Sequence, residues 1–131
     1  CKEQFDKVLL DAPCSGEGRF LGTNVGTYRN WSTKTVKELA KLQKKLLKSA
    51  YQALKPDGIM VYSTCTLNKK ENEEVLQWAI ENLNLKLLDI DMDLKEKMQG
   101  FTEGLDKRIS KAIRILPSKN MEGFFVAKLR K

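Results

Sequence analysis

The sequence contains no histidine and only three cysteines among its 131 residues. Without histidine, a Ser-His or Cys-His pair cannot activate a nucleophile, so any reacting thiol must be activated in another way. The number of cysteines is odd, and no two of them have the CxxC spacing, which argues against a structural zinc site or a disulfide framework. We therefore expect no bound metal.

Long apolar runs are also missing. No stretch approaches the roughly 18 apolar residues that a membrane helix needs, and no charged start followed by an apolar segment indicates a signal peptide. Hydrophobic residues make up 41% and charged residues 31%, which is the balance of a globular protein. We expect one domain, no membrane contact and a cytoplasmic location.

Acidic residues are outnumbered. Lys and Arg total 24 against 17 Asp and Glu, and the formal net charge is +7. An excess of positive charge attracts polyanions such as RNA at low salt. A solvated, lysine-rich surface explains the same composition equally well, so the charge alone does not decide between the two.

What the chain does contain is an alternation of strand and helix patterns. Apolar runs over 5–11 and 59–65 predict strands that are buried on both faces, and 85–90 and 123–129 are further strand candidates. The segment 91–120 is polar and weakly patterned, and we assign no element to it.

Two helices are expected between these strands. Ser32 or Thr33 is a hydroxyl N-cap for a helix that continues with apolar residues at helical spacing to about Leu54, where the turn "KPDG" (55–58) ends it. Asn68 and Glu71 have the spacing of a capping box that opens a second helix through about Leu83.

This order predicts a Rossmann-like sheet. Strand, helix, strand, helix and strand with short connections imply right-handed crossovers and a parallel sheet with helices on both faces. Ligands bind such sheets beyond the carboxyl ends of the strands. Cys14 and Cys65 both lie just past strand ends, so we expect them to face one cleft.

A pair of thiols suits one particular chemistry. Carbon 5 of cytosine is a poor nucleophile, but a thiolate that adds to carbon 6 makes carbon 5 able to attack an electrophilic methyl group. The proton on carbon 5 must then be removed and the thiol expelled, so a second group near the ring is useful.

Three motifs carry a family resemblance. "DAPCSGEG" (11–18) and "YSTCTLNKKENEEV" (62–75) resemble the paired Pro-Cys and Thr-Cys motifs of the Sun (Fmu) family of RNA cytosine carbon-5 methyltransferases, and "RILPSKNMEGFFVAKLRK" (114–131) resembles that family's closing segment. The resemblance implies a class I methyltransferase fold with a mostly parallel sheet and an antiparallel last strand. It also implies S-adenosylmethionine as cofactor and RNA as substrate.

The resemblance assigns roles to the residues of these motifs. Cys65 corresponds to the nucleophile, Cys14 to the cysteine that resolves the covalent intermediate, and Asp11 to the aspartate that pairs with the cytosine ring. Asp11 and Pro13 are also expected on the cofactor side. The alternatives are structural, because a cysteine at a strand end is often a small core residue and Asp11 could simply cap the loop.

Other polar and aromatic residues have weaker claims. Arg19, Arg29 and Lys34 lie in or beside the loop after Cys14 and are the expected phosphate contacts. Asn72 and Glu73 match the family's "ENE", but we prefer a structural role for them at a helix start. Trp31 and Trp78 are expected to pack rather than stack on RNA, and Phe124 and Phe125 to belong to the core.

The chain departs from the family in two places. Ser118 follows Pro117 where the family carries a Pro-His pair. Nothing before Phe5 resembles the strand and glycine-rich turn with which class I methyltransferases hold their cofactor. We therefore interpret residues 1–131 as the C-terminal portion of a single catalytic domain, inactive when isolated and prone to self-association through the exposed strand 5–11.

Several functions compete at this stage. The first is an RNA cytosine-5 methyltransferase, for which the wording of the motifs favours ribosomal RNA over transfer RNA. The second is an RNA-binding or assembly module without turnover. The third is a DNA cytosine methyltransferase, which also uses a Pro-Cys loop but leaves the Thr-Cys motif unexplained.

Overall fold

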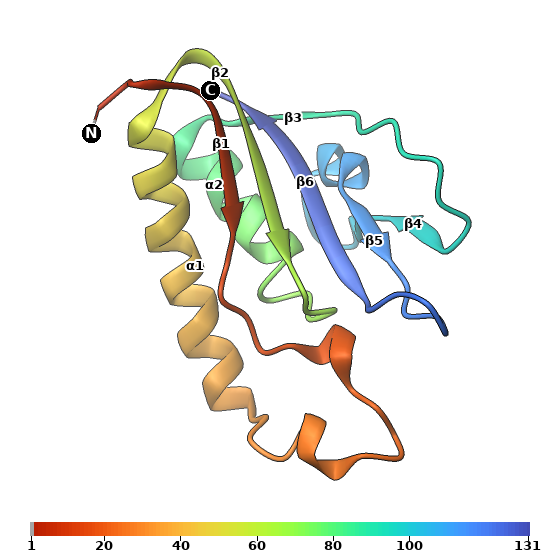
Figure 1. Ribbon diagram of the computed structural model, residues 1–131. Helices are drawn as coiled ribbons and strands as arrows, with labels where there is room; N and C mark the ends of the chain where they lie inside the picture. Colours follow the sequence, from red (N-terminus) through yellow and green to blue (C-terminus); the bar gives the residue numbers. More distant parts are fainter. Residues whose placement is uncertain (1) are drawn as a thin grey trace.

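A computed structural model describes residues 2–131, which form a six-stranded sheet with two long helices on one of its faces (Figure 1). The strands lie in the order β1-β2-β6-β5-β4, and β3 also pairs with β6. The elements are β1 Phe5–Asp11, η1 Glu17–Arg19, η2 Val25–Thr27, α1 Thr33–Ala53, β2 Leu54–Thr64, α2 Glu73–Leu83, β3 Lys86–Leu88, β4 Lys97–Gln99, η3 Lys107–Lys111, β5 Ile113–Ile115 and β6 Phe124–Arg130.

Most strands run in one direction. β1 is parallel to β2, whereas β6 is antiparallel to β2, β3 and β5. β1, β2, β3 and β5 therefore point the same way, and β6 and β4 point the opposite way. The expected sheet, mostly parallel with an antiparallel last strand, is confirmed.

The two long helices lie on the same face, so the prediction of helices on both faces is wrong for the described residues. α1 and α2 contact each other and share one apolar core with the sheet. The reason is the strand order. The chain moves from β1 to its neighbour β2, and then from β2 past β6 to β3, so both crossovers progress in the same direction across the sheet. Two right-handed crossovers that progress in one direction place their helices on one face.

Alternation along the strands separates this core from the opposite face. Met60 and Tyr62 of β2 are fully buried against the helices, and the intervening Val61 faces the other way and is half-buried. β6 contributes Phe125 to the same core, and Trp78 of α2 packs against it, as expected. Other members of the core are Leu47, Val75, Leu76, Ala79, Ala127 and Leu129.

The first helix begins as predicted. Ser32 is the N-cap of α1, and its side chain accepts a hydrogen bond from the backbone N–H of Thr35 at 3.0 Å. α1 ends at Ala53, and residues 55–58 loop out of the pairing of β2, since Phe5 pairs with Leu54 but Lys7 already pairs with Ile59. The "KPDG" turn thus ends the helix by forming an irregularity at the start of β2.

The strand β1 stands at one end of the strand order, and its burial differs from the prediction. Val8 and Leu10 are half-buried and pack against the core, but Leu9 on the opposite face is 72% exposed. Within residues 2–131, no helix covers that face, so β1 is not buried on both sides. In the same part of the chain, no helix combines the length and the apolar character needed to cross a membrane.

Candidate active site

The sulfur atoms of Cys14 and Cys65 lie 3.1 Å apart, although the residues are 51 positions apart in sequence. The parallel pairing of β1 with β2 explains this closeness. Asp11 at the end of β1 pairs with Ser63 of β2, so the loops that leave the two strands start side by side. Both cysteines are half-buried and unbridged, and they face each other as the sequence predicts.

The two thiols form a hydrogen-bonded pair in which Cys14 holds its proton strongly. Burial, followed by the hydrogen bond with Cys65, raises the pKa of the Cys14 thiol from 9.0 to about 12. The backbone N–H of Gly16 acts in the opposite direction with a smaller effect. The Cys14 thiol therefore keeps its proton at neutral pH.

Asp11 and Pro13 lie on the exposed side of the same loop. The carboxylate of Asp11 accepts a hydrogen bond from the Ser63 hydroxyl at 2.9 Å and remains exposed at the end of β1. The carbonyl oxygen of Pro13 accepts a hydrogen bond from the Gln43 side chain at 3.0 Å. A rigid strand end thus orients the carboxylate beyond the sheet edge, where parallel sheets bind ligands.

The loop after Cys14 is fixed to two other segments through Gly18. The Gly18 N–H donates to the carbonyl of Cys65 at 3.0 Å, and the Gly18 carbonyl accepts from the N–H of Gly123 at 2.8 Å. A Cβ atom at position 18 would lie 1.9 Å from the Gly123 carbonyl oxygen, so only glycine fits. The closing segment before β6 is therefore built directly onto the cysteine loops.

The capping box predicted for α2 is wrong. α2 begins at Glu73, and its N-cap Asn72 makes no side-chain capping bond. The carboxylate of Glu71 is fully buried and accepts hydrogen bonds from Ser15, Thr66 and Gln43 instead of capping Asn68. Sequence analysis therefore missed Ser15 and Glu71 as site residues, and the only signal was their presence within the two cysteine motifs.

Asn72 and Glu73 have the structural contacts expected of them. The side chain of Asn72 accepts from the Thr64 hydroxyl at 2.7 Å and donates to the Thr66 carbonyl at 2.9 Å. Glu73 forms a buried ion pair with Arg114, whose guanidinium also donates to the Leu67 carbonyl and lies 4.0 Å from the centre of the Phe101 ring. Both residues hold the segment after Cys65 against the rest of the domain.

The expected phosphate contacts are all exposed. Arg19 ends η1 and lines a hollow with Ser15, Gly16 and Glu122, so it lies beside the cysteine loop. Arg29 and Lys34 lie further along, between η2 and the first turn of α1. The structure brings Arg19 close to the site, whereas Arg29 is exposed on the loop and Lys34 is exposed on α1.

The aromatic residues of this loop border a small hollow. It has a volume of about 230 Å³, and its lining includes Cys14, Phe20 and Trp31. Trp31 is 39% exposed, and its indole N–H donates to Glu17 at 2.9 Å. Trp31 therefore packs only partly, which differs from the packing role expected for it. Ser118, which stands where the family has histidine, lines a neighbouring hollow with Gly18 and Arg19.

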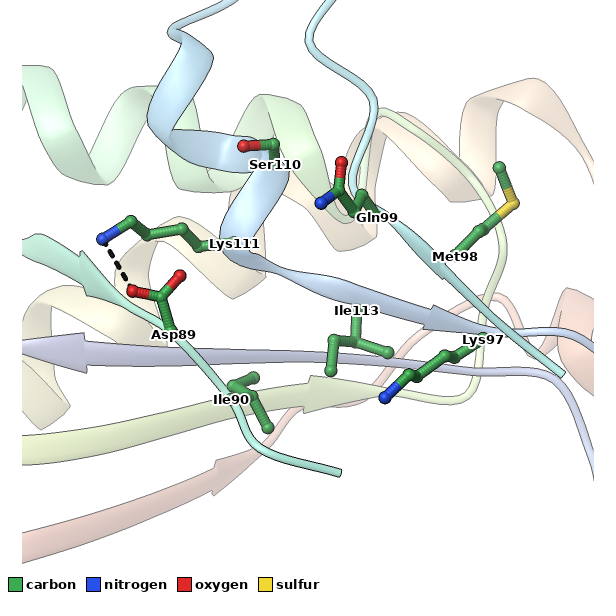
Figure 2. Close-up of a pocket in the computed structure, with 8 residues that line it drawn as sticks. All are labelled: Asp89, Ile90, Lys97, Met98, Gln99, Ser110, Lys111 and Ile113. Carbon is green, nitrogen blue, oxygen red and sulfur yellow. Dashed lines mark ion pairs between the residues drawn. The ribbon is translucent and has the colours of Figure 1, made fainter. Parts of the chain in front are cut away.

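Another pocket lies away from the cysteine motifs, between the end of β3, the strands β4 and β5, and η3 (Figure 2). Its volume is about 290 Å³. Figure 2 shows the amine of Lys111 directed at Asp89, with which it pairs at 3.1 Å, with Ile113 on β5 and Ile90 on the segment that follows β3. No residue of the cysteine motifs lines it. Among residues 2–131, no group of three or more His, Cys, Asp or Glu side chains could hold a metal ion.

Two solved structures have a similar fold. A methyltransferase homolog protein from Pyrococcus horikoshii is 36% identical with a TM-score of 0.79, and the match covers 98% of this chain and 40% of that one. NSun6 from the same organism, determined with SFG, is 32% identical with a TM-score of 0.77, covering 98% of this chain and 30% of that one. These neighbours and the sheet topology define the fold as the Rossmann-like fold of class I methyltransferases.

Sequence comparison then gives the family. The chain matches the family described as "16S rRNA methyltransferase RsmB/F" over residues 1–130, and it belongs to that family. It is 42% identical to the ribosomal RNA small subunit methyltransferase F of Cronobacter sakazakii and 44% identical to that of Vibrio vulnificus. Each match covers 98% of this chain and 26% of the relative, so the chain spans about a quarter of the length of these relatives.

Proposed function

We propose that the protein carrying this chain is an S-adenosylmethionine-dependent RNA cytosine-5 methyltransferase, and that residues 1–131 form the C-terminal portion of its single catalytic domain. The observation that carries the proposal is the pair of sulfur atoms 3.1 Å apart at the ends of two parallel strands. Cysteines that only fill a core do not need their sulfurs in contact. Addition of a thiol to a pyrimidine ring and its later release, in contrast, need two reactive groups beside carbon 5 and carbon 6 of the ring.

The roles follow from the geometry of the site. Cys65, as the thiolate, forms a bond from its sulfur to carbon 6 of the cytosine. The carbon 5–carbon 6 double bond breaks, its electron pair moves to carbon 5, and Asp11 holds the ring nitrogen. Cys14 serves the later stage, in which the carbon 5 proton leaves and the bond between Cys65 and carbon 6 breaks. The 3.1 Å distance between the two sulfur atoms supports this role, because it places Cys14 beside the bond that breaks.

The residues present fit one side of a cofactor site. Asp11 is exposed beyond the end of β1, with its orientation fixed by Ser63, and Pro13 follows it on the same edge. SFG, with which the NSun6 neighbour was determined, is an analogue of S-adenosylmethionine. When bound, S-adenosylmethionine supplies the methyl group. The glycine-rich strand-to-helix turn that usually holds the rest of such a cofactor has no counterpart in these 131 residues.

We further propose that Arg19, Arg29 and Lys34 bind RNA phosphates, with the RNA lying along the loop that follows Cys14. Their exposure, the net charge of +7 and the position of Arg19 beside Ser15 support this path. Neutralising all three should lower the slope of log affinity against log salt by up to about 2 for a single strand. An unchanged slope would move the RNA path to another face.

The substrate we propose is small-subunit ribosomal RNA, and the location is the cytoplasm. The family description and the relatives' names support the substrate. For the isolated 131-residue chain we propose self-association through β1, whose outer face exposes Leu9.

Two variants of the intact protein test the reaction. Cys65→Ala should abolish methylation and covalent RNA adducts, since no other group of the site can add to carbon 6. Cys14→Ala should accumulate an adduct, because attack proceeds while release fails. Denaturing gels with labelled RNA distinguish the two, and an adduct that survives the loss of Cys65 but not of Cys14 would reverse the assignment. Binding without any adduct or methylation in the unchanged protein would favour the RNA-binding module.

A further inference from the structure

Each cysteine of the site is followed by a hydroxyl residue, and the two hydroxyls pair as the two sulfurs do. Ser15 follows Cys14 and Thr66 follows Cys65, and their side-chain oxygens lie 2.9 Å apart. The sulfur pair at 3.1 Å and the hydroxyl pair are therefore adjacent contacts between the same two segments. Each hydroxyl residue is the next residue after a cysteine. A contact that holds the two hydroxyl residues in place therefore also restricts the positions of the two cysteines.

The carboxylate of Glu71 joins both hydroxyls. Its Oε2 accepts from the Ser15 hydroxyl at 2.5 Å and from the Thr66 hydroxyl at 3.3 Å, and its Oε1 accepts from the backbone N–H of Ser15 at 2.9 Å. Oε1 also accepts from the Gln43 amide at 3.0 Å, and the same amide donates to the carbonyl of Pro13. One buried side chain thus connects the segment on each side of Cys14, the segment after Cys65, and α1.

Glu71 is itself held in place by the sheet. The hydroxyl of Tyr62, fully buried in β2, donates to the Glu71 carbonyl at 2.7 Å. The next residue, Asn72, bonds to Thr64 and Thr66. The backbone at position 71 cannot shift without breaking contacts to β2. The Glu71 carboxylate therefore starts from a fixed backbone and can hold the loops after β1 and β2 in position.

The chemistry of the four partners explains why a carboxylate is needed. All of them donate to Glu71, and an ionised carboxylate is the one side chain that only accepts, at both oxygens. An amide of the same shape would direct its NH2 group at one pair of donors. If the NH2 group replaces Oε2, the hydroxyls of Ser15 and Thr66 must rotate to accept from it. If it replaces Oε1, it faces the backbone N–H of Ser15, which cannot accept. Glutamine therefore preserves these hydrogen bonds only in part.

We propose that Glu71 is a positioning residue that sets the distance between the sulfur atoms of Cys14 and Cys65. It contacts neither sulfur in the structure and acts through Ser15 and Thr66. The consequence for catalysis rests on the proposed methyltransferase function, whereas the effect on the sulfur distance does not depend on it.

The first experiment reports on the distance between the two sulfur atoms and needs no methylation reaction. Two protein thiols and one oxidised glutathione exchange to give one Cys14–Cys65 disulfide and two reduced glutathiones, and the equilibrium constant reports how closely the sulfurs are held. In the full-length protein, quantified by peptide mass mapping, Glu71→Ala should lower this constant by about tenfold or more, and Glu71→Gln by less. A circular dichroism spectrum of each variant checks that it is folded.

A matched control is available two residues away. Glu73 is also fully buried, but its carboxylate contacts Arg114 and Phe101 and neither hydroxyl. Glu73→Gln keeps an oxygen acceptor for Arg114, and the bond from Arg114 to the Leu67 carbonyl remains, so the constant should stay within about twofold of the unchanged protein. If Glu71→Ala fails to fold, Glu71→Gln and this control still decide the question. Equal values for the Glu71 and Glu73 variants, or no change at Glu71, would overturn the proposal.

The second experiment follows the reaction. Glu71→Ala should lower kcat with little change in KM, because RNA contacts remain while the thiols are displaced, and Glu71→Gln should recover part of the loss. A change in KM alone would overturn the positioning role. Failure of the unchanged protein to methylate RNA would refute the proposed function, yet the glutathione measurement would still support or refute the role of Glu71.

Discussion

At the scale of single residues, the contact between Cys14 and Cys65 affects the acidity of the Cys14 thiol. The pKa of Cys14 is raised to about 12, first by burial and then by the hydrogen bond with Cys65. Below pH 9 this thiol should stay protonated in the folded protein and react slowly with alkylating reagents, although it is only half-buried.

Removing Cys65 should therefore make Cys14 more acidic. In Cys65→Ala, the pKa of Cys14 should fall below about 12 but remain above 9.0, because the contribution of Cys65 is lost and burial persists. Iodoacetamide labelling of the Cys14 peptide, measured by mass spectrometry at a series of pH values, gives the midpoint directly. The same midpoint in both proteins would show that Cys65 does not influence the proton.

At the scale of elements, the ion pair of Glu73 and Arg114 joins α2 to β5. Both side chains are buried, with 0% and 4% of their surfaces exposed, and the contact bridges 41 positions of sequence. Together with the bond from Arg114 to the Leu67 carbonyl, it fixes the segment after Cys65 to the distant end of the sheet.

Breaking one side of this pair should be costly. Arg114→Met leaves the Glu73 carboxylate buried without its partner and should lower the free energy of unfolding by about 3–5 kcal/mol in urea denaturation. The double variant with Glu73→Leu should lose less than the single one, since no unpaired charge remains. Lys55→Met, which breaks the exposed pair with Asp6, should have no measurable effect. Equal losses for the single and double variants would contradict the argument.

The same pair shows where sequence reasoning stops. Apolar runs and a hydroxyl cap were enough to predict β1, α1, β2 and β6, because these elements are specified by neighbouring residues. β4 and β5 have three residues each, too few for a periodic pattern, and they depend on partners such as Glu73 that are distant in sequence.

The burial of Gln43 is a second feature that helical spacing does not predict. Gln43 is buried whereas its apolar neighbour Leu42 is 41% exposed, because the Gln43 amide donates to the Pro13 carbonyl and to the Glu71 carboxylate.

At the scale of the whole molecule, the strand β1 leaves one face of the sheet uncovered within the described residues. β1 is the last strand in the order, and Phe5 and Leu9 are 49% and 72% exposed. An edge strand with exposed apolar side chains pairs readily with other strands. The cysteine site lies at the end of this same strand, so the integrity of β1 and of the site are linked.

The isolated chain should therefore self-associate or be poorly soluble. Light scattering should detect dimers or larger species, and Leu9→Lys should reduce them, because a charge at an edge opposes pairing. Calorimetric titration should show no binding of S-adenosylmethionine, since the Asp11 edge is only one side of a site. A monomer that binds the cofactor at roughly micromolar concentration would contradict both expectations.

The contact between Gly18 and Gly123 limits how the gene can change. Every missense change of a glycine codon adds at least a Cβ atom, and at position 18 that atom would meet the Gly123 carbonyl oxygen at 1.9 Å. At Gly22, on the tip of the same loop, an added Cβ meets nothing within 4 Å. Missense changes of codon 22 should thus be tolerated, whereas those of codon 18 should not, because the backbone of a segment encoded near the other end of the sequence occupies the space.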